Sequence, residues 1–226
     1  MRALLFLLVS SFLISSCSNT KYLTSSYDRL ATDHQIIAIL PYDNIYSGKV
    51  PEDLNQHDFD EMIIADALYF QSSLYSQLLQ ESGLSSGDIN IDFQDIRTTN
   101  EILETEGIYL QELHKVSSEN LAELLNVDAV VRVTLRKNFL LSNEESFFVD
   151  VAGQIYRDVV RGPLAWKTWG MSRSSDIDIH ATIMDGNEGI AVWSLHKQAS
   201  TNWDLSTDEV IESINHHISK KFPYRR

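Results

Sequence analysis

The first seventeen residues constrain this 226-residue chain more than any other feature. Arg2 supplies a positive charge, residues 3–14 form an apolar run, and two serines stand before Cys17. A positive end, a short apolar core and small residues at a cleavage point are typical of a secretory signal, and about 12 apolar residues are too few to span a bilayer. We therefore expect residues 1–16 to be removed and the remainder to fold outside the cytoplasm.

Cys17 is the only cysteine of the chain, so no disulfide within the chain can stabilise the fold. The run Ile14-Ser15-Ser16-Cys17 resembles the lipobox of bacterial lipoproteins. The resemblance implies a diacylglycerol on the Cys17 thiol, cleavage before this residue and acylation of the new amino group, with palmitate as an expected chain. Two or three acyl chains hold a protein stably to a membrane, whereas one holds it only marginally. The alternative is an ordinary secretory signal that happens to end near a cysteine.

The mature chain is large enough for one domain and strongly acidic. Its roughly 210 residues can bury about 70% of the surface that the unfolded chain exposes. Loss of Arg2 leaves 17 basic and 32 acidic residues, a formal charge of −15. This balance argues against nucleic acid as a partner and against adhesion to an anionic membrane face.

Three regions follow from the pattern of polar and apolar residues. Residues 17–35 combine the lipidated cysteine with a polar stretch and read as a tether. Residues 36–226 form a single α/β domain, which opens on the apolar run 36–40. Residues 139–175 fit neither a clear helix nor a clear strand, and we interpret them as an insertion.

The domain is predicted to be an α/β sandwich with a mixed sheet of about five strands and helices packed on it. Apolar residues at intervals of three and four predict helices, and alternation of apolar and polar residues predicts strands. Capping boxes mark helix starts at Asp58, Thr98 and Ser206, and Ser117 opens a further helix. The expected strands cover 36–40, 89–93, 128–136, 177–183 and 190–195; the expected helices cover 59–79, 98–107, 117–125 and 206–221.

The insertion contains the one locally basic and aromatic patch in this acidic chain. Trp166 and Trp169 flank Lys167, and Arg173 follows. Tryptophan and arginine dominate the energetics of protein interfaces, and tryptophan also favours the membrane interface. These four residues are therefore a candidate partner contact. The alternative is that the tryptophans complete the core while the basic residues face water.

The sharpest catalytic motifs are missing from the sequence: it has no nucleophile elbow, phosphate loop, paired-histidine zinc helix or dinucleotide fingerprint. Asp176, Asp178 and His180 project from one face of a strand and could ligate a metal with His196 on the next strand. The favoured interpretation is a polar sheet face, since alternation alone places polar residues there. We expect no resident metal and no cofactor.

Three short motifs together resemble the CsgG-like and LpoB-like family of envelope lipoproteins. They are IIAILPYDN at 36–44, LNVDAVV at 125–131, and a hairpin that carries Asp185, Gly189 and Trp193. The resemblance implies an open α/β sandwich without enzymatic activity. Some members form oligomeric secretion channels in the outer membrane, and others dock on peptidoglycan synthases and stimulate them.

This chain departs from both kinds of member. Residues 139–175 lack the alternating strands of about 10 residues that a membrane barrel needs. The tether is also shorter than that of activators which must reach across the periplasm.

These observations lead to one expected function and one alternative. We expect an envelope lipoprotein that is anchored through Cys17 and binds another envelope protein, or a second copy of itself, as a non-catalytic accessory or assembly factor. Ser18, directly after the lipidated cysteine, suggests the outer membrane by family analogy. The alternative is an envelope hydrolase with a carboxylate and histidine site or a metal site.

Overall fold

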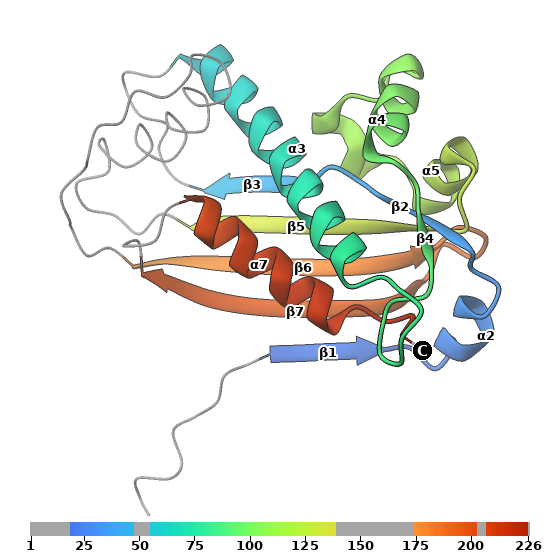
Figure 1. The fold of residues 1–226 in the computed structure, drawn as a ribbon. Coiled ribbons are helices and arrows are strands. Elements are labelled where there is room, and N and C mark those ends of the chain that lie inside the picture. Colours follow the sequence, from blue (N-terminus) through green and yellow to red (C-terminus); the bar gives the residue numbers. More distant parts are fainter. Residues whose placement is uncertain (1–18, 48–54, 139–173, 203–206, 226) are drawn as a thin grey trace, which may run out of the picture.

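The computed structural model describes residues 19–47, 55–138, 174–202 and 207–225 (Figure 1). These residues form strands and helices that alternate along most of the chain. The strands are β1 (Asn19–Leu23), β2 (Ile36–Ile39), β3 (Asp43–Ser47), β4 (Asp92–Phe93), β5 (Ala129–Asn138), β6 (Ser174–Asp185) and β7 (Ala191–Asn202). The helices are α2 (Tyr27–Ala31), α3 (Gln56–Gln80), α4 (Ile96–Thr105), the 3₁₀ helix η1 (Leu110–Lys115), α5 (Ser118–Leu125) and α7 (Thr207–Lys221).

Within the described residues, seven strands join in one open, mixed sheet. The order across the sheet is β1-β7-β6-β5-β2-β4, and β3 pairs with β5 beyond the end of β2. β2 is parallel to β4 and β5, and β3 is parallel to β5, whereas β5, β6, β7 and β1 pair antiparallel in turn. The class predicted from the sequence, a mixed sheet with packed helices, is confirmed. The sheet has seven strands where we expected about five.

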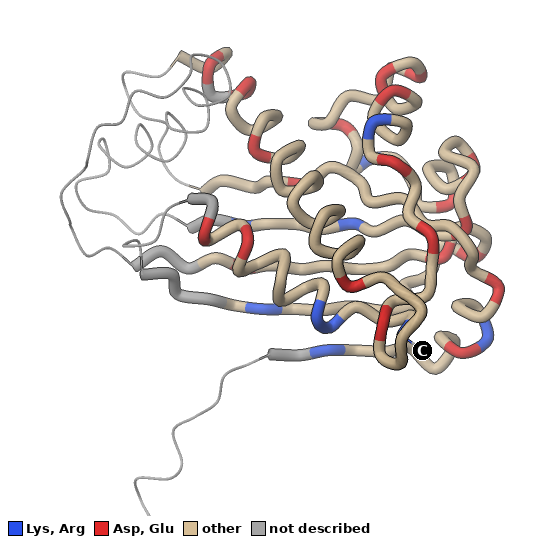
Figure 2. The backbone as a smooth tube through the Cα atoms, viewed as in Figure 1, with Lys and Arg blue, Asp and Glu red and all other residues tan. Residues whose placement is uncertain are grey.

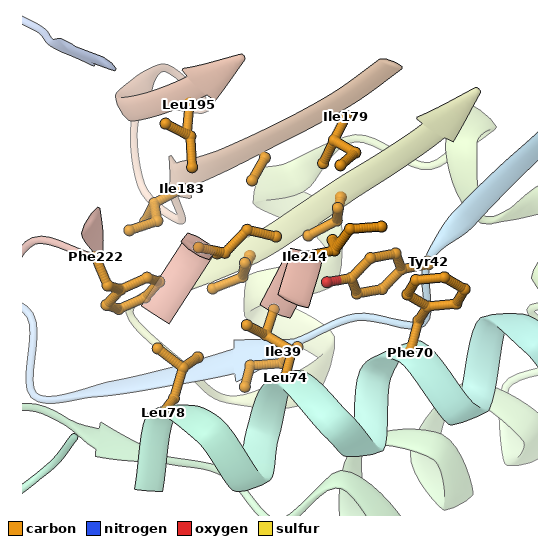
Figure 3. Packing of buried hydrophobic residues seen from close by; sticks show 14 of the residues in the cluster. Ile39, Tyr42, Phe70, Leu74, Leu78, Ile179, Ile183, Leu195, Ile214 and Phe222 are labelled. Carbon is orange, nitrogen blue, oxygen red and sulfur yellow. The ribbon is translucent and has the colours of Figure 1, made fainter. Parts of the chain in front are cut away.

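The main hydrophobic core lies between the sheet and the helices α3 and α7, which cross the same face (Figure 1). Alternate apolar residues of β5, β6 and β7 point into it, as strand geometry requires, among them Val131 and Val133 of β5, Ile179 and Ile183 of β6, and Leu195 of β7. Figure 3 shows Ile39 of β2 beside Leu74 and Leu78 of α3, and Phe222 across from them. This layer supplies most of the buried apolar surface and thus most of the stability of the fold.

A smaller core covers only part of the opposite face. Leu103 of α4, Leu113 of η1 and Leu121 of α5 pack on Ala38 and Val130 of the sheet. β2 is therefore buried on both faces, which explains its continuous apolar sequence. Beyond Val130 this face of the sheet carries polar residues.

Two polar contacts inside the domain connect its layers. Gln71 of α3 and Asn100 of α4 exchange side-chain amide hydrogen bonds of 2.9 and 3.1 Å, and the Gln71 amide also donates to the Ile39 carbonyl at 2.7 Å. Asn215 of α7 donates to the Phe70 carbonyl at 3.1 Å and accepts from the Tyr42 hydroxyl. Buried polar groups cost stability unless they are paired, so these contacts fix how the helices sit on β2.

Helix starts follow the expected chemistry but not always the expected residue. Ser117 caps α5 as predicted, because its hydroxyl accepts from the Asn120 amide. In α3 the cap is Asn55, which accepts from the amide of Asp58 at 2.9 Å, so the predicted cap Asp58 lies inside the first turn. In α4 the cap is Asp95 instead of Thr98. For α3 and α4 the predicted start lies a few residues after the observed one, because several residues that can cap a helix stand close together there.

The segment expected to be a tether differs from that expectation in its described part. β1 pairs antiparallel with β7, with Asn19 opposite Lys197 and Leu23 opposite Trp193. α2 follows, and its Leu30 is buried in the main core. The sequence of β1 is short and polar and did not predict a strand. An edge strand is stabilised mainly by backbone hydrogen bonds to its neighbour, which leave no pattern in its sequence. The folded part of the chain therefore extends at least to Asn19.

Candidate functional site

The exposed side of β5, β6 and β7 carries a continuous set of polar side chains. Strand pairing aligns them in rows across the three strands, with Thr134, His180 and His196 in one row and Arg136 beside Asp178 in the next. Most of these side chains are half-buried and the others are exposed. We call this surface the open sheet face; its members are Arg132, Thr134, Arg136, Asp178, His180, Thr182, Ser194, His196 and Gln198.

Two histidines at the centre of the open sheet face have different partners. The Nε2 atom of His196 lies 2.5 Å from Oδ1 of Asp178, and Nε2 of His180 lies 3.0 Å from Oγ of Ser194. The two imidazole rings meet edge to face, with their centroids 6.4 Å apart. The sequence prediction that Asp178, His180 and His196 share one face is confirmed.

The electrostatic environment keeps His180 neutral. Partial burial lowers the pKa of His180 below its ordinary value, and the neighbouring His196 and Arg136 lower this pKa further. Asp178 acts in the opposite direction but does not outweigh them. At neutral pH the His180 ring is therefore an uncharged hydrogen-bonding group.

This arrangement does not assemble a Ser-His-Asp triad. A triad needs one histidine that contacts both the serine and the orienting carboxylate. Here Ser194 contacts His180, while Asp178 contacts the other imidazole, that of His196. Among the described residues, no three His, Cys, Asp or Glu side chains lie close enough to hold a metal ion. Asp176 belongs to β6, but its side chain lies outside the described part.

Arg132 joins the open sheet face to the neighbouring helix. Its Nε donates to the Ser118 hydroxyl at 3.0 Å, and a terminal nitrogen donates to the Val116 carbonyl. Burial lowers the pKa of this guanidinium, with Asp43 and Glu119 opposing the effect. These contacts fix the orientation of Arg132, so it borders the face without moving freely over it.

A buried network of three polar side chains, His34, Asp185 and Tyr224, was not predicted from the sequence. Nε2 of His34 lies 2.9 Å from Oδ2 of Asp185, and Nδ1 of His34 lies 2.7 Å from the Tyr224 hydroxyl. The other oxygen of Asp185 accepts from the backbone amides of Asn187 and Glu188. Only Asp185 had a signal in the sequence, as the first residue of the turn between β6 and β7.

The position of the buried network of His34, Asp185 and Tyr224 favours a structural role over a chemical one. The side chains of His34 and Asp185 are each only 2% exposed, so a substrate has no path to them. Burial raises the pKa of the Tyr224 phenol, and the nearby Tyr27 and Asp185 raise it further. The phenol therefore stays protonated, and the three side chains hold the ends of β2, β6 and the chain's last described residues together.

The remaining candidate residues lie outside the described part of the chain. These are the predicted lipidation site Cys17 and the predicted partner contact Trp166, Lys167, Trp169 and Arg173. In the described ranges, none of the helices is both long enough and apolar enough to cross a bilayer.

No protein-family model matches the chain, and no curated protein matches it. Solved structures are similar in fold. The lipoprotein GNA1162 from Neisseria meningitidis is 11% identical with a TM-score of 0.40, over 81% of this chain and 94% of that one. A PelC dodecamer from Paraburkholderia phytofirmans is 11% identical with a TM-score of 0.41, over 92% and 99%.

The LpoB C-terminal domain from Salmonella enterica is also similar, at 9% identity and a TM-score of 0.33, over 77% of this chain and 91% of that one. The similar structures thus include one titled as a lipoprotein and one titled as LpoB. Similarity at this level does not assign the chain to a family or give it a function.

Proposed function

We propose that this chain is a lipid-anchored protein of the bacterial envelope that binds another envelope protein without catalysis, as an accessory or assembly factor. The observation that carries the proposal is the division of partners on the open sheet face. Ser194 and Asp178 hold different imidazoles, so the polar groups are arranged as separate hydrogen-bonding pairs. Such a surface can bind a partner, but it does not link a serine, a histidine and a carboxylate in the order that a serine hydrolase uses.

The extent and the charges of the open sheet face support a protein partner. It extends over three neighbouring strands and presents both signs of charge, with Arg136 beside Asp178. Small-molecule sites are concave and mostly apolar, whereas protein interfaces are flat and combine polar and apolar groups. A second candidate contact is the segment with Trp166 and Trp169.

The predicted anchor strengthens any such contact. Acyl chains on Cys17 would confine the domain to the membrane surface and raise its local concentration there, so that a weak contact becomes effective. Mass spectrometry of the protein purified from membranes tests this part. A mature chain that begins at an acylated Cys17 supports the anchor, and an unmodified thiol or an uncleaved leader contradicts it. The outer membrane is our proposed location, because Ser18 follows the lipidated cysteine.

Crosslinking in living cells tests the binding role. A photoreactive residue replaces Gln198, which is exposed on the open sheet face, and in a matched control replaces Glu106 at the end of α4. We expect one discrete adduct from position 198 and none from position 106, with mass spectrometry identifying either another envelope protein or a second copy. Equal, diffuse labelling from both positions would contradict a binding role for this face.

The alternative function is an envelope hydrolase, and the contact between Asp178 and His196 is the observation that favours it. Metal analysis of the purified protein, with melting measured before and after chelation, separates the two functions. The hydrolase is favoured if the protein holds a stoichiometric ion, if the variant His196→Ala loses this ion, and if removal of the ion lowers the melting temperature. A metal-free protein with unchanged melting agrees with the binding proposal.

A further inference from the structure

The charge of this chain is unevenly distributed. The formal net charge is −14, yet Figure 2 shows Lys and Arg residues gathered along β1, β7 and the end of α7. Apart from Lys220, which pairs with Glu81, the described lysines at this place are Lys21 of β1, Lys197 of β7 and Lys221 of α7, and His217 lies one helical turn before Lys221. We call Lys21, Lys197, His217 and Lys221 the basic edge.

Strand pairing puts the members of the basic edge on one side of the sheet. Lys21 stands opposite Leu195, and Lys197 stands opposite Asn19, so the two lysines are diagonal neighbours with side chains on the same face. Leu195 points into the core beneath α7, which identifies this face as the one that α7 covers. One helical turn separates His217 from Lys221 on α7.

The electrostatics of His217 agree with this placement. Burial lowers the pKa of His217, and the charges of Lys197, Lys221 and His216 lower it further. Positive charges from two different elements thus act on one imidazole. Within the described residues, Lys21, Lys197 and Lys221 form no ion pair, whereas the neighbouring Lys220 is bound to Glu81 at 2.7 Å.

The basic edge lies next to the predicted anchor. One residue separates Cys17 from Asn19, and an extended chain covers at most about 7 Å over two residue steps. Asn19 is itself fixed to β7 opposite Lys197. A domain attached in this way has no spacer that would let it leave the membrane surface, and its attached corner carries three lysines, Lys21, Lys197 and Lys221, that form no ion pair with the described residues.

We propose that the basic edge rests on anionic phospholipid headgroups of the membrane in which Cys17 is anchored. This inference depends on the proposed anchoring. The net negative charge of the chain does not prevent it, because salt screens charges that lie more than about 8 Å from the surface. Only residues near the attached corner then determine the local attraction, and each basic residue near an anionic surface contributes about 1 kcal/mol.

This contact would set the orientation of the whole domain. β1 and β4 are the two ends of the strand order, separated by five spacings, or about 24 Å. With the basic edge on the membrane, the sheet stands on β1 and carries α4 away from the lipid (Figure 1). The open sheet face then points parallel to the membrane plane. A partner that binds this face must therefore lie beside the domain, close to the membrane surface.

Energy transfer between the domain and the lipid tests this orientation. Because acylation blocks Cys17, a new cysteine takes a dye selectively: Glu104→Cys on α4 reports the far side, and Ser213→Cys on α7 reports the helix beside the basic edge. The lipidated protein is placed in phosphatidylcholine vesicles with and without phosphatidylglycerol, with an acceptor on the headgroups. Addition of phosphatidylglycerol should lower transfer from position 104 by about twofold and raise it from position 213, because α4 packs against β2 and α7 against β7, three strand spacings or about 14 Å apart in the sheet.

Two triple variants of equal charge change provide the control. In Lys21→Glu/Lys197→Glu/Lys221→Glu the effect of phosphatidylglycerol should disappear. In Arg29→Glu/Arg97→Glu/Lys115→Glu, whose residues are exposed and do not belong to the basic edge, the effect should remain. Circular dichroism confirms that both triple variants are folded.

The outcomes separate this inference from the proposed function. Protein that is purified from cell membranes and carries no acyl chain on Cys17 would contradict the anchoring itself. A lipidated, vesicle-bound protein with the same transfer in both lipids would contradict only the basic-edge contact. Loss of the effect in both triple variants, or a dependence on the protein-to-lipid ratio that indicates a second copy on the edge, would also overturn it.

Discussion

The Nε2 atom of His34 lies 2.9 Å from a carboxylate oxygen of Asp185, although 151 positions separate the two residues in the sequence. The carboxylate can only accept, so the proton of this hydrogen bond is on Nε2, and in the neutral ring Nδ1 accepts from the Tyr224 hydroxyl. Asp185 also accepts from the Asn187 and Glu188 amides. One buried carboxylate therefore shapes the β6–β7 turn and connects it to the start of β2.

Replacement of Asp185 should be costly because several donors depend on it. We expect Asp185→Ala to lower the free energy of unfolding by about 3 kcal/mol, since it leaves the buried His34 without an acceptor and removes the acceptor of two partly buried backbone amides. Urea unfolding followed by circular dichroism measures the change. Tyr224→Phe removes only the end of the chain of contacts and should cost about 1 kcal/mol. A loss of less than 1 kcal/mol in Asp185→Ala would show that the network does not support the fold.

Gly186 should tolerate a methyl group less well than Gly87 does. A Cβ at position 186 would lie 2.6 Å from the Ala122 Cβ and 2.8 Å from the Asp128 carbonyl oxygen, neither of which can move alone. We expect Gly186→Ala to destabilise the domain by about 2 kcal/mol through overpacking. Gly87 has a φ of +91° but open space around it, so Gly87→Ala should cost only about 1 kcal/mol of backbone strain. The reverse order in melting experiments would refute this account.

His180 should make the domain less stable in acid. Its pKa is lower in the folded state than the ordinary value of about 6.5, so the unfolded chain binds a proton more readily. As the pH falls through about 6.5 toward the folded pKa, the free energy of unfolding should decrease. The His217 pKa is lowered too and contributes in the same direction. NMR titration should place the His180 transition below 6.5, and His180→Gln should flatten the pH dependence. A transition above 6.5 would be inconsistent with the geometry.

The tryptophan segment offers a test of the second candidate contact. If Trp166 and Trp169 contact a partner, the double variant Trp166→Ala/Trp169→Ala should weaken capture of that partner several-fold and leave the melting temperature nearly unchanged. Co-purification from membranes and thermal unfolding of the same preparations measure both quantities. A fall of many degrees in melting temperature would assign the tryptophans to the core. Lys167→Ala and Arg173→Ala test the accompanying basic residues.

Much of the fold could be predicted because its central elements obey simple periodicities. Val131, Val133 and Leu135 alternate with Arg132 and Thr134, and the structure buries the first set while it leaves the second on the open sheet face. The same alternation correctly placed His180 and His196 together. α3 extends only a few residues beyond its predicted range of 59–79.

Non-local pairing explains what could not be predicted. β1 is too short and polar to show the alternation of apolar and polar residues that predicts a strand. It forms because its backbone pairs with that of β7. The pairs Gln71–Asn100 and Tyr42–Asn215 and the contacts of His34 involve residues that carry no signal for one another along the chain. The open sheet face was predicted as a polar surface, but the division of Ser194 and Asp178 between two imidazoles depends on side-chain rotamers.

The pairing of β1 with β7 has a consequence for the order in which the domain matures. Asn19 leaves the ribosome early, whereas Lys197, the residue opposite it, is synthesised 178 positions later. Contacts of such high sequence separation form slowly, since a long loop must close first. Until β7 has been synthesised, the first strand has no neighbour to pair with, and its backbone hydrogen-bonding groups stay available to any other strand that approaches them.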